Sequence, residues 1–144
     1  MTYNIAHISL QESLKYKKQL SKLHLRFGLM WPTYINAIAC DDKDVSIFIV
    51  KQRENIVGWM KARIFDNNNP QYYNNIYPVL NGKIYQNNLV KYNERKKIID
   101  YMIYVNSSYR GKGIGSALIK AGIEYADKMG AIPHFYEKAS CMVS

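Results

Sequence analysis

Glycine and basic residues alternate in the segment RGKGIGS, which runs from Arg110 to Ser116. The apolar residues before it, 98–105, are rich in β-forming types, and those after it recur at helical spacing as far as Gly130. A strand-to-helix turn of this kind aims unpaired backbone N–H groups at one spot near a helix N-terminus, which attracts phosphate. The glycines let an anion approach closely, and Arg110 and Lys112 add positive charge. The segment therefore predicts a phosphate-binding loop.

Three kinds of phosphate loop can be compared with this segment. A Walker A loop needs four residues between its first glycine and Gly-Lys-Ser/Thr, and no register here supplies them. A dinucleotide fingerprint that starts at Gly113 needs glycine at position 118, which is Leu118. The pattern Arg/Gln-x-x-Gly-x-Gly/Ala after a strand ending in valine does match. With its flanks, VNSSYRGKGIGSALI resembles the acyl-CoA pyrophosphate loop of the GNAT superfamily of N-acetyltransferases. The alternative is a glycine-rich turn without a ligand.

The resemblance implies transfer of an acetyl group from acetyl-CoA to a primary amine of a small molecule or protein. The reaction in the family is a direct attack within a ternary complex. The loop backbone would bind the diphosphate, and the exposed edge of the preceding strand would pair with pantetheine like an added strand. The implied CoA-binding residues are Ile103, Tyr104, Val105, Arg110, Gly111, Lys112, Gly113, Ile114, Gly115 and Ser116.

A base must also take a proton from the acceptor ammonium. The family often has a glutamate four residues before the strand's final valine, and Tyr101 stands at that position here. Asp100 is adjacent, but strand alternation sends its side chain to the opposite face unless a β-bulge returns it to the cleft. The candidates are therefore Asp100, and Tyr101 acting directly or through a water chain. His134 is a further candidate base, with a structural histidine as its alternative.

A proton donor for the departing thiolate is the other requirement. The family often uses a tyrosine after its fifth strand, and Tyr136 matches if FYEK begins the following helix. The alternative is a core tyrosine. A covalent route through Cys40 or Cys141 lacks a His/Asp signature beside either residue. The catalytic candidates are thus Asp100, Tyr101 and Tyr136.

Composition limits the other classes of function. At 144 residues we expect one domain, residues 1–144, with its own core. The net charge of +9 suits an acidic ligand such as coenzyme A, while the scattered basic residues show no nucleic-acid module, so nucleic acid is an unlikely partner. No segment has the roughly 20 apolar residues of a membrane span. The two cysteines lack metal-type spacing, so we expect no metal, free thiols and a cytoplasmic protein.

The first two-thirds of the chain predict a strand, helices and a hairpin. Residues 1–8 suit a strand, and residues 10–27 a helix that begins with a Ser9–Glu12 capping box and ends at Gly28. A second, short helix is expected over 32–39. Strands 45–51 and 56–65, joined by a turn at 52–55, form a hairpin like the one that precedes the central strand in the family. Gly58 within it marks a bulge or a close packing contact.

Residues 66–97 show no clean period and predict an extended loop with a short hairpin or helix over 84–92. In the family an insertion here lies beside the acceptor cleft. Four tyrosines of this segment are then acceptor contacts, or else anchors of a surface loop: Tyr72, Tyr73, Tyr77 and Tyr85.

The residues after Gly130 allow two interpretations. Residues 132–139 form a strand that splays from the central strand, which we favour, or FYEK begins a helix; Pro133 suits both. The resemblance implies an α+β fold in α/β/α layers, with a mixed, mostly antiparallel twisted sheet flanked by helices. Its C-terminal part would be abbreviated, and cover from a second subunit would make a homodimer. A CoA-binding or partner-binding protein without turnover is the alternative function.

Overall fold

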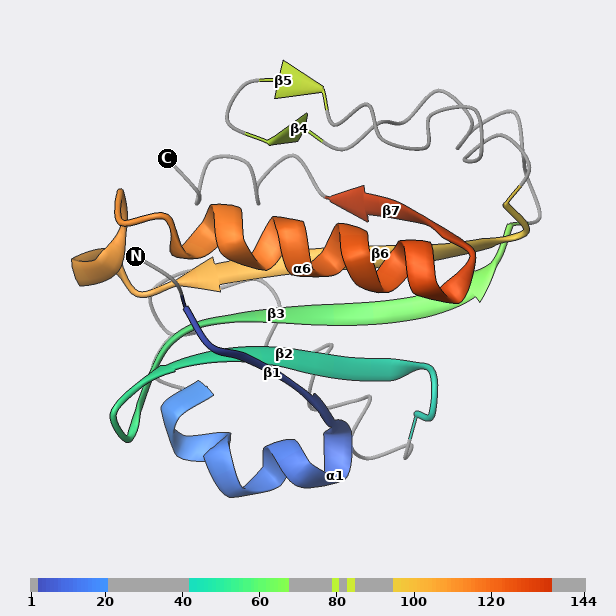
Figure 1. Cartoon of the computed structure of the whole chain (residues 1–144). Coiled ribbons are helices and arrows are strands. Elements are labelled where there is room, and N and C mark those ends of the chain that lie inside the picture. The colour runs from blue at the N-terminus through green and yellow to red at the C-terminus, as the bar shows by residue number, and fades with distance from the viewer. Residues whose placement is uncertain (1–2, 21–41, 68–78, 81–82, 85–94, 136–144) are drawn as a thin grey trace.

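The computed structural model describes residues 3–20, 42–67, 79–80, 83–84 and 95–135. Its centre is a twisted five-stranded sheet in the order β1-β2-β3-β6-β7 (Figure 1). The strands are β1 (Ile5–Ser9), β2 (Val45–Gln52), β3 (Asn55–Asp66), β6 (Lys97–Val105) and β7 (Ala131–Phe135). The pairs β1–β2, β2–β3 and β3–β6 are antiparallel, and the pair β6–β7 is parallel. The predicted mixed, mostly antiparallel α+β sheet is confirmed.

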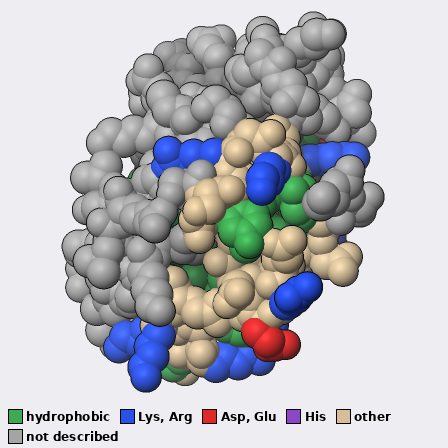
Figure 2. Space-filling view, turned by 90° about the vertical axis from the view of Figure 1, so that its left-hand side faces the viewer, with side chains coloured by type: hydrophobic (Ala, Val, Ile, Leu, Met, Phe, Trp, Pro, Cys, Tyr) green, Lys and Arg blue, Asp and Glu red, His purple; other side chains and the backbone are tan. Residues whose placement is uncertain are grey.

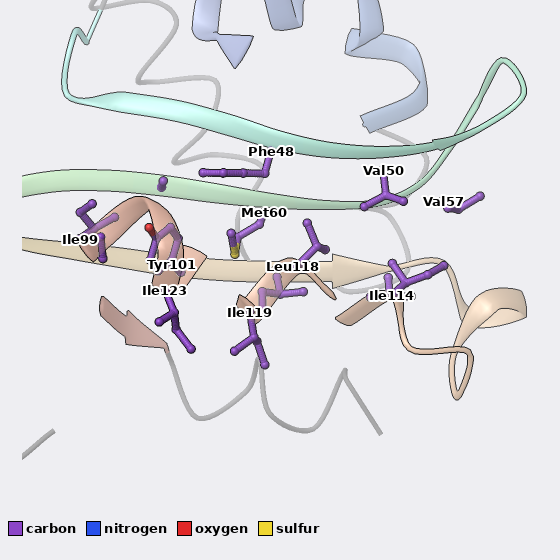
Figure 3. Packing of buried hydrophobic residues seen from close by; sticks show 14 of the residues in the cluster. Phe48, Val50, Val57, Met60, Ile99, Tyr101, Ile114, Leu118, Ile119 and Ile123 are labelled. Atoms are coloured by element: carbon purple, nitrogen blue, oxygen red, sulfur yellow. The ribbon is translucent and has the colours of Figure 1, made fainter. Parts of the chain in front are cut away.

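Helices lie on both faces of this sheet. The long helix α6 (Ile114–Met129) covers one face, and α1 (Leu10–Ser13) with the 3-10 helix η1 (Leu14–Tyr16) lies on the other (Figure 1). Figure 3 shows the core under α6, where side chains from β2, β3 and β6 meet the apolar stripe of the helix. The labelled members are Phe48, Val50, Val57, Met60, Ile99, Tyr101, Ile114, Leu118, Ile119 and Ile123. A second core on the α1 face contains Trp59 and Tyr104.

The N-terminal helix begins as its sequence predicts. Ser9 Oγ accepts a hydrogen bond from the Glu12 backbone N–H at 3.1 Å, and the Ser9 N–H donates to Glu12 Oε1 at 3.2 Å. This capping box satisfies donors that the first helical turn leaves unpaired. Residues 17–20 are helical after η1, and Leu20 is fully buried. The rest of the predicted helix, and the second helix over 32–39, lie outside the described residues.

The predicted hairpin is formed by β2 and β3. Its turn is shorter than predicted and consists of Arg53 and Glu54, because the strands extend to residues 52 and 55. The pairing register shifts between Val50 and Lys51, which places an irregularity beside Gly58. A bulge there is one of the two roles that the sequence suggested for this glycine.

In the chain segment that connects β3 to β6, two short strands form a separate hairpin. It pairs β4 (Val79–Leu80) with β5 (Lys83–Ile84), so it begins before the segment 84–92 that was predicted to contain such an element. The four tyrosines suggested as acceptor contacts, Tyr72, Tyr73, Tyr77 and Tyr85, lie outside the described residues.

The chain continues as a strand after α6. The helix ends at Gly130, which has the left-handed φ of 65° typical of a glycine C-cap. Strand β7 then pairs with β6 from Lys97/Ala131 to Tyr101/Phe135. The strand interpretation is therefore confirmed as far as Phe135, and Tyr136 lies outside the described residues.

Candidate active site

The glycine loop has the backbone conformation that an anion cradle needs. Gly111 and Gly113 have φ values of 75° and 84°, in the left-handed region that side chains other than glycine rarely adopt. Gly113 is the N-cap of α6, and no side chain caps the helix. No side-chain cap therefore competes with a ligand at the helix start, and the positive end of the helix dipole lies behind it.

Positive charge surrounds this loop. Arg110 and Lys112 are exposed, and the Lys112 ammonium lies 5.1 Å from the ring centre of Tyr109. The Tyr3 hydroxyl donates a hydrogen bond to the Lys112 carbonyl at 2.7 Å, which ties the loop to the chain before β1. Figure 2 shows this end of the molecule. On the described surface, Lys and Arg side chains outnumber the acidic ones. The loop thus combines backbone donors with a basic surround, which suits a diphosphate.

The start of α6 is positioned by close contact with the sheet. A Cβ at Gly58 would lie only 2.8 Å from Ile114 Cγ2. Because glycine has no side chain, the first residue of α6 can pack directly against β3. Ile114 and Leu118 are buried at this contact. The close packing contact suggested for Gly58 is therefore present as well.

One edge of β6 is open beside the loop. Strand β3 pairs with β6 as far as Val105, but pairing with β7 stops at Tyr101/Phe135. Among the described residues, 102–105 therefore have no strand partner on the side of β7. The residues predicted to bind pantetheine, Ile103, Tyr104 and Val105, lie on this edge, where their backbone groups can pair with an added extended ligand.

Tyr101 and Asp100 face opposite sides of the sheet. Tyr101 is fully buried under α6, where its hydroxyl donates to the Gly122 carbonyl at 2.7 Å and its ring stacks on Phe135 at 4.9 Å. The register of β6 against β3 has no shift, so the bulge suggested for this strand is absent from Lys97–Val105. Asp100 lies on the opposite face from Tyr101, as strand alternation predicts, and lines a cavity on the face away from α6.

Asp100 also contacts His134, which lies 34 positions later in the chain. The two residues are direct partners in the parallel pairing of β6 and β7, and His134 Nδ1 lies 2.7 Å from Asp100 Oδ1. Each side chain is 18% exposed. The pair lies one step before the last pair of the ladder, Tyr101/Phe135. Two residues that the sequence offered as separate base candidates therefore form one hydrogen-bonded pair where the open edge of β6 begins.

The cavity beside Asp100 has a volume of about 540 Å³. Its lining is mixed, with both signs of charge and an apolar part: Asp44, Lys61, Arg63, Ile64, Phe65, Asp100 and Met102. Lys61 is only 8% exposed. Burial lowers the pKa of its ammonium, as does the nearby Arg63, while Asp42 and Asp100 oppose this shift. Sequence reasoning missed Lys61, although a lone lysine within the apolar run IVGWMKARIF is a visible signal.

Two other features, a metal-binding cluster and a membrane-spanning helix, are absent from the described residues. None of their His, Cys, Asp or Glu side chains form a group of three or more that could hold a metal ion. In the same part of the chain, the helices are too short or too polar to cross a membrane. Cys40 and Cys141 lie outside it, as does Tyr136.

Comparisons with known proteins agree with this fold. Residues 16–139 match the model of the acetyltransferase (GNAT) family. A ribosomal-protein-alanine N-acetyltransferase from Brucella melitensis biovar Abortus 2308 aligns with a TM-score of 0.55 at 18% identity, over 95% of this chain and 82% of its own. A GNAT family acetyltransferase from Staphylococcus aureus gives 0.60 at 14% identity, over 94% and 85%.

A third solved structure contains a bound ligand. The aminoglycoside N-acetyltransferase AAC(6')-Iy in complex with CoA aligns with a TM-score of 0.52 at 14% identity, over 92% of this chain and 76% of its own. At these identities the structures show a shared fold. No curated protein matches the chain.

Proposed function

The chain belongs to the GNAT acetyltransferase family, and we propose that it transfers an acetyl group from acetyl-CoA to a primary amine. One observation carries the proposal beyond the family. The open edge of β6 leads from the glycine loop to the Asp100–His134 pair, and the cavity lined by Asp100 lies on the face away from α6. A coenzyme paired along that edge would place its reactive end beside a base and an acceptor space.

The loop and the strand edge have separate tasks in binding. The N–H groups at the start of α6 hold the diphosphate, while exposed Arg110 and Lys112 screen its charge. The backbone of Ile103, Tyr104 and Val105 pairs with the amide groups of the pantetheine arm. Bound there, acetyl-CoA supplies an acetyl group activated as a thioester.

The Asp100–His134 pair prepares the acceptor. The carboxylate of Asp100 attracts the ammonium into the cavity, and the pair accepts its proton, so that the neutral amine can attack the acetyl carbon. With Asp100 ionised, His134 Nδ1–H donates to the carboxylate, which orients the imidazole. We assign no proton transfer to Tyr101, whose buried hydroxyl donates to the Gly122 carbonyl.

The departing thiolate must take up a proton as the amide forms. We assign this step to Tyr136, on the basis of the family resemblance alone. Protonated by Tyr136, CoA leaves as a thiol. The nitrogen loses two protons on going from ammonium to amide: the first passes through the Asp100–His134 pair to solvent, and the second restores Tyr136.

Release of free CoA thiol, measured over a broad panel of primary amines, tests the proposal. Asp100→Asn and His134→Gln should each lower kcat/KM by about 10²- to 10⁴-fold, the range expected for a general base, and leave acetyl-CoA affinity nearly unchanged. Asp66→Asn is the matched control, since Asp66 is an exposed carboxylate at the end of β3, away from the cavity lining.

Two results would count against parts of this proposal. Unchanged rates in both Asp100→Asn and His134→Gln would refute the base assignment. Tight acetyl-CoA binding without thiol release for any amine would favour the alternative, a CoA-binding protein without turnover.

A further inference from the structure

We propose that Lys61 binds an acidic group of the acceptor, so that the acceptor is a small amino-acid-like amine. The inference rests on the proposed acetyl transfer, and it names the class of amine that the cavity accepts. Its basis is the charge pattern of one face of the sheet, where Lys61 and Arg63 of β3 lie beside Asp100 and Met102 of β6.

Lys61 is a buried cation that faces a cavity. Only 8% of the residue is exposed, and it lines the 540 Å³ space beside Asp100. Within the part of the chain that the structure describes, the Lys61 ammonium makes no hydrogen bond or ion pair. Lysine is rarely buried without a counter-charge, because desolvation disfavours the ammonium. Asp42 and Asp100 oppose this effect only from a distance, and an anionic group entering the cavity would give the ammonium a direct counter-charge.

The strand register places the opposite charges at a short separation. Arg63 pairs directly with Asp100, and Lys61 pairs with Met102, so all four side chains lie on the face away from α6. Directly paired residues of antiparallel strands have Cα atoms about 4.5–5.5 Å apart. Lys61 is the diagonal neighbour of Asp100, at a separation of about 7–8 Å along the backbone. Both side chains line the same cavity, so a ligand whose ammonium binds Asp100 can present an acidic group to Lys61. An ammonium and a carboxylate on one carbon atom, or on adjacent ones, fit this spacing.

Lys61 is the main contributor to this binding site. The side chain of Arg63 is 54% exposed and lies 3.6 Å from Asp42, so it is hydrated and partly neutralised. Met102 and Phe65 add an apolar wall that suits an apolar side chain. A polyamine would place additional positive charge against two cations, which disfavours it.

Leucine and leucinamide distinguish a carboxylate from a neutral group of the same size. With acetyl-CoA saturating, the KM of wild-type protein should be about tenfold or more lower for leucine, because a hydrogen bond between charged groups is stronger than a neutral one. Lys61→Met should remove this preference while leucinamide is still acetylated, and Lys61→Arg should restore part of it. Lys97→Met is the matched control, since Lys97 is exposed and lies outside the cavity lining.

A binding measurement separates this inference from the proposed reaction. N-acetyl-leucine and N-acetyl-leucinamide, titrated into the protein by calorimetry, need no turnover. Tighter binding of N-acetyl-leucine that is lost in Lys61→Met supports the inference even if no thiol is released from acetyl-CoA. Equal binding of the two compounds overturns it, as does acetylation of leucinamide in preference to leucine, and either result leaves acetyl transfer itself standing.

Discussion

Replacing Gly58 with alanine tests how β3 positions the start of α6. The added Cβ would lie 2.8 Å from Ile114 Cγ2, 3.3 Å from the Tyr104 carbonyl oxygen and 3.6 Å from Leu118 Cδ1. The first distance is short of ordinary contact by about half an ångström. Ile114 is buried at the first position of the helix, so the helix start must shift to relieve the contact.

The magnitude follows from two opposing effects. Overpacking of this kind costs about 1–3 kcal/mol. Alanine in place of a strand glycine recovers about 0.5–1 kcal/mol of conformational entropy. From the middle of each range, the free energy of unfolding of Gly58→Ala should fall by about 1 kcal/mol. The melting temperature should fall by about 2–4 °C per kcal/mol for a domain of this size. Acetyl-CoA affinity should fall as well, because the diphosphate cradle moves with the helix.

Urea denaturation in a double-mutant cycle isolates the contact. Ile114→Leu lacks a Cγ2 atom and should rescue Gly58→Ala, whereas Ile114→Val keeps both Cγ atoms and should not. An unchanged stability of Gly58→Ala would refute the reasoning. Equal rescue by leucine and valine would show that the steric conflict lies elsewhere.

Two further substitutions test the core and the pH dependence. Tyr101→Phe should lower the free energy of unfolding by about 1 kcal/mol, because the buried bond to the Gly122 carbonyl is lost; a urea midpoint equal to wild type would contradict this. Burial, and secondarily Lys128, lower the pKa of His7, whose ring stacks on Phe48 at 4.1 Å. Below pH 6.5, His7 is therefore protonated more fully in the unfolded chain than in the folded protein. The free energy of unfolding should fall as the pH is lowered from 7.5 to 5. His7→Gln should weaken that fall, and an identical pH profile would contradict it.

Local patterns predicted the elements that carry the coenzyme loop. The apolar run of β6, the glycines and the spacing along α6 are all contiguous in sequence, and the structure has them within about a residue of the predicted bounds. The capping box at Ser9 was predictable for the same reason, since both of its partners lie within one helical turn.

The Asp100–His134 pair could not be read from the sequence. Its contact depends on the parallel register of β6 and β7, which a single strand pattern does not specify. The faces of Asp100 and Tyr101 were likewise ambiguous, because a bulge anywhere in β6 would have exchanged them. Lys61 gave a local signal, but only the pairing of β3 with β6 places it diagonal to Asp100 on the same face of the sheet.

Calorimetric titration of acetyl-CoA into the wild-type protein and Gly113→Asp tests the central claim most directly. The substitution puts a side chain and a negative charge at the φ of 84° where the diphosphate is proposed to bind. Gly130→Asp is the matched control, because it strains a glycine with φ of 65° at the other end of the same helix. We predict micromolar binding to wild type and Gly130→Asp, and none to Gly113→Asp. Absence of binding to the wild-type protein, or equal binding to all three, would contradict the account.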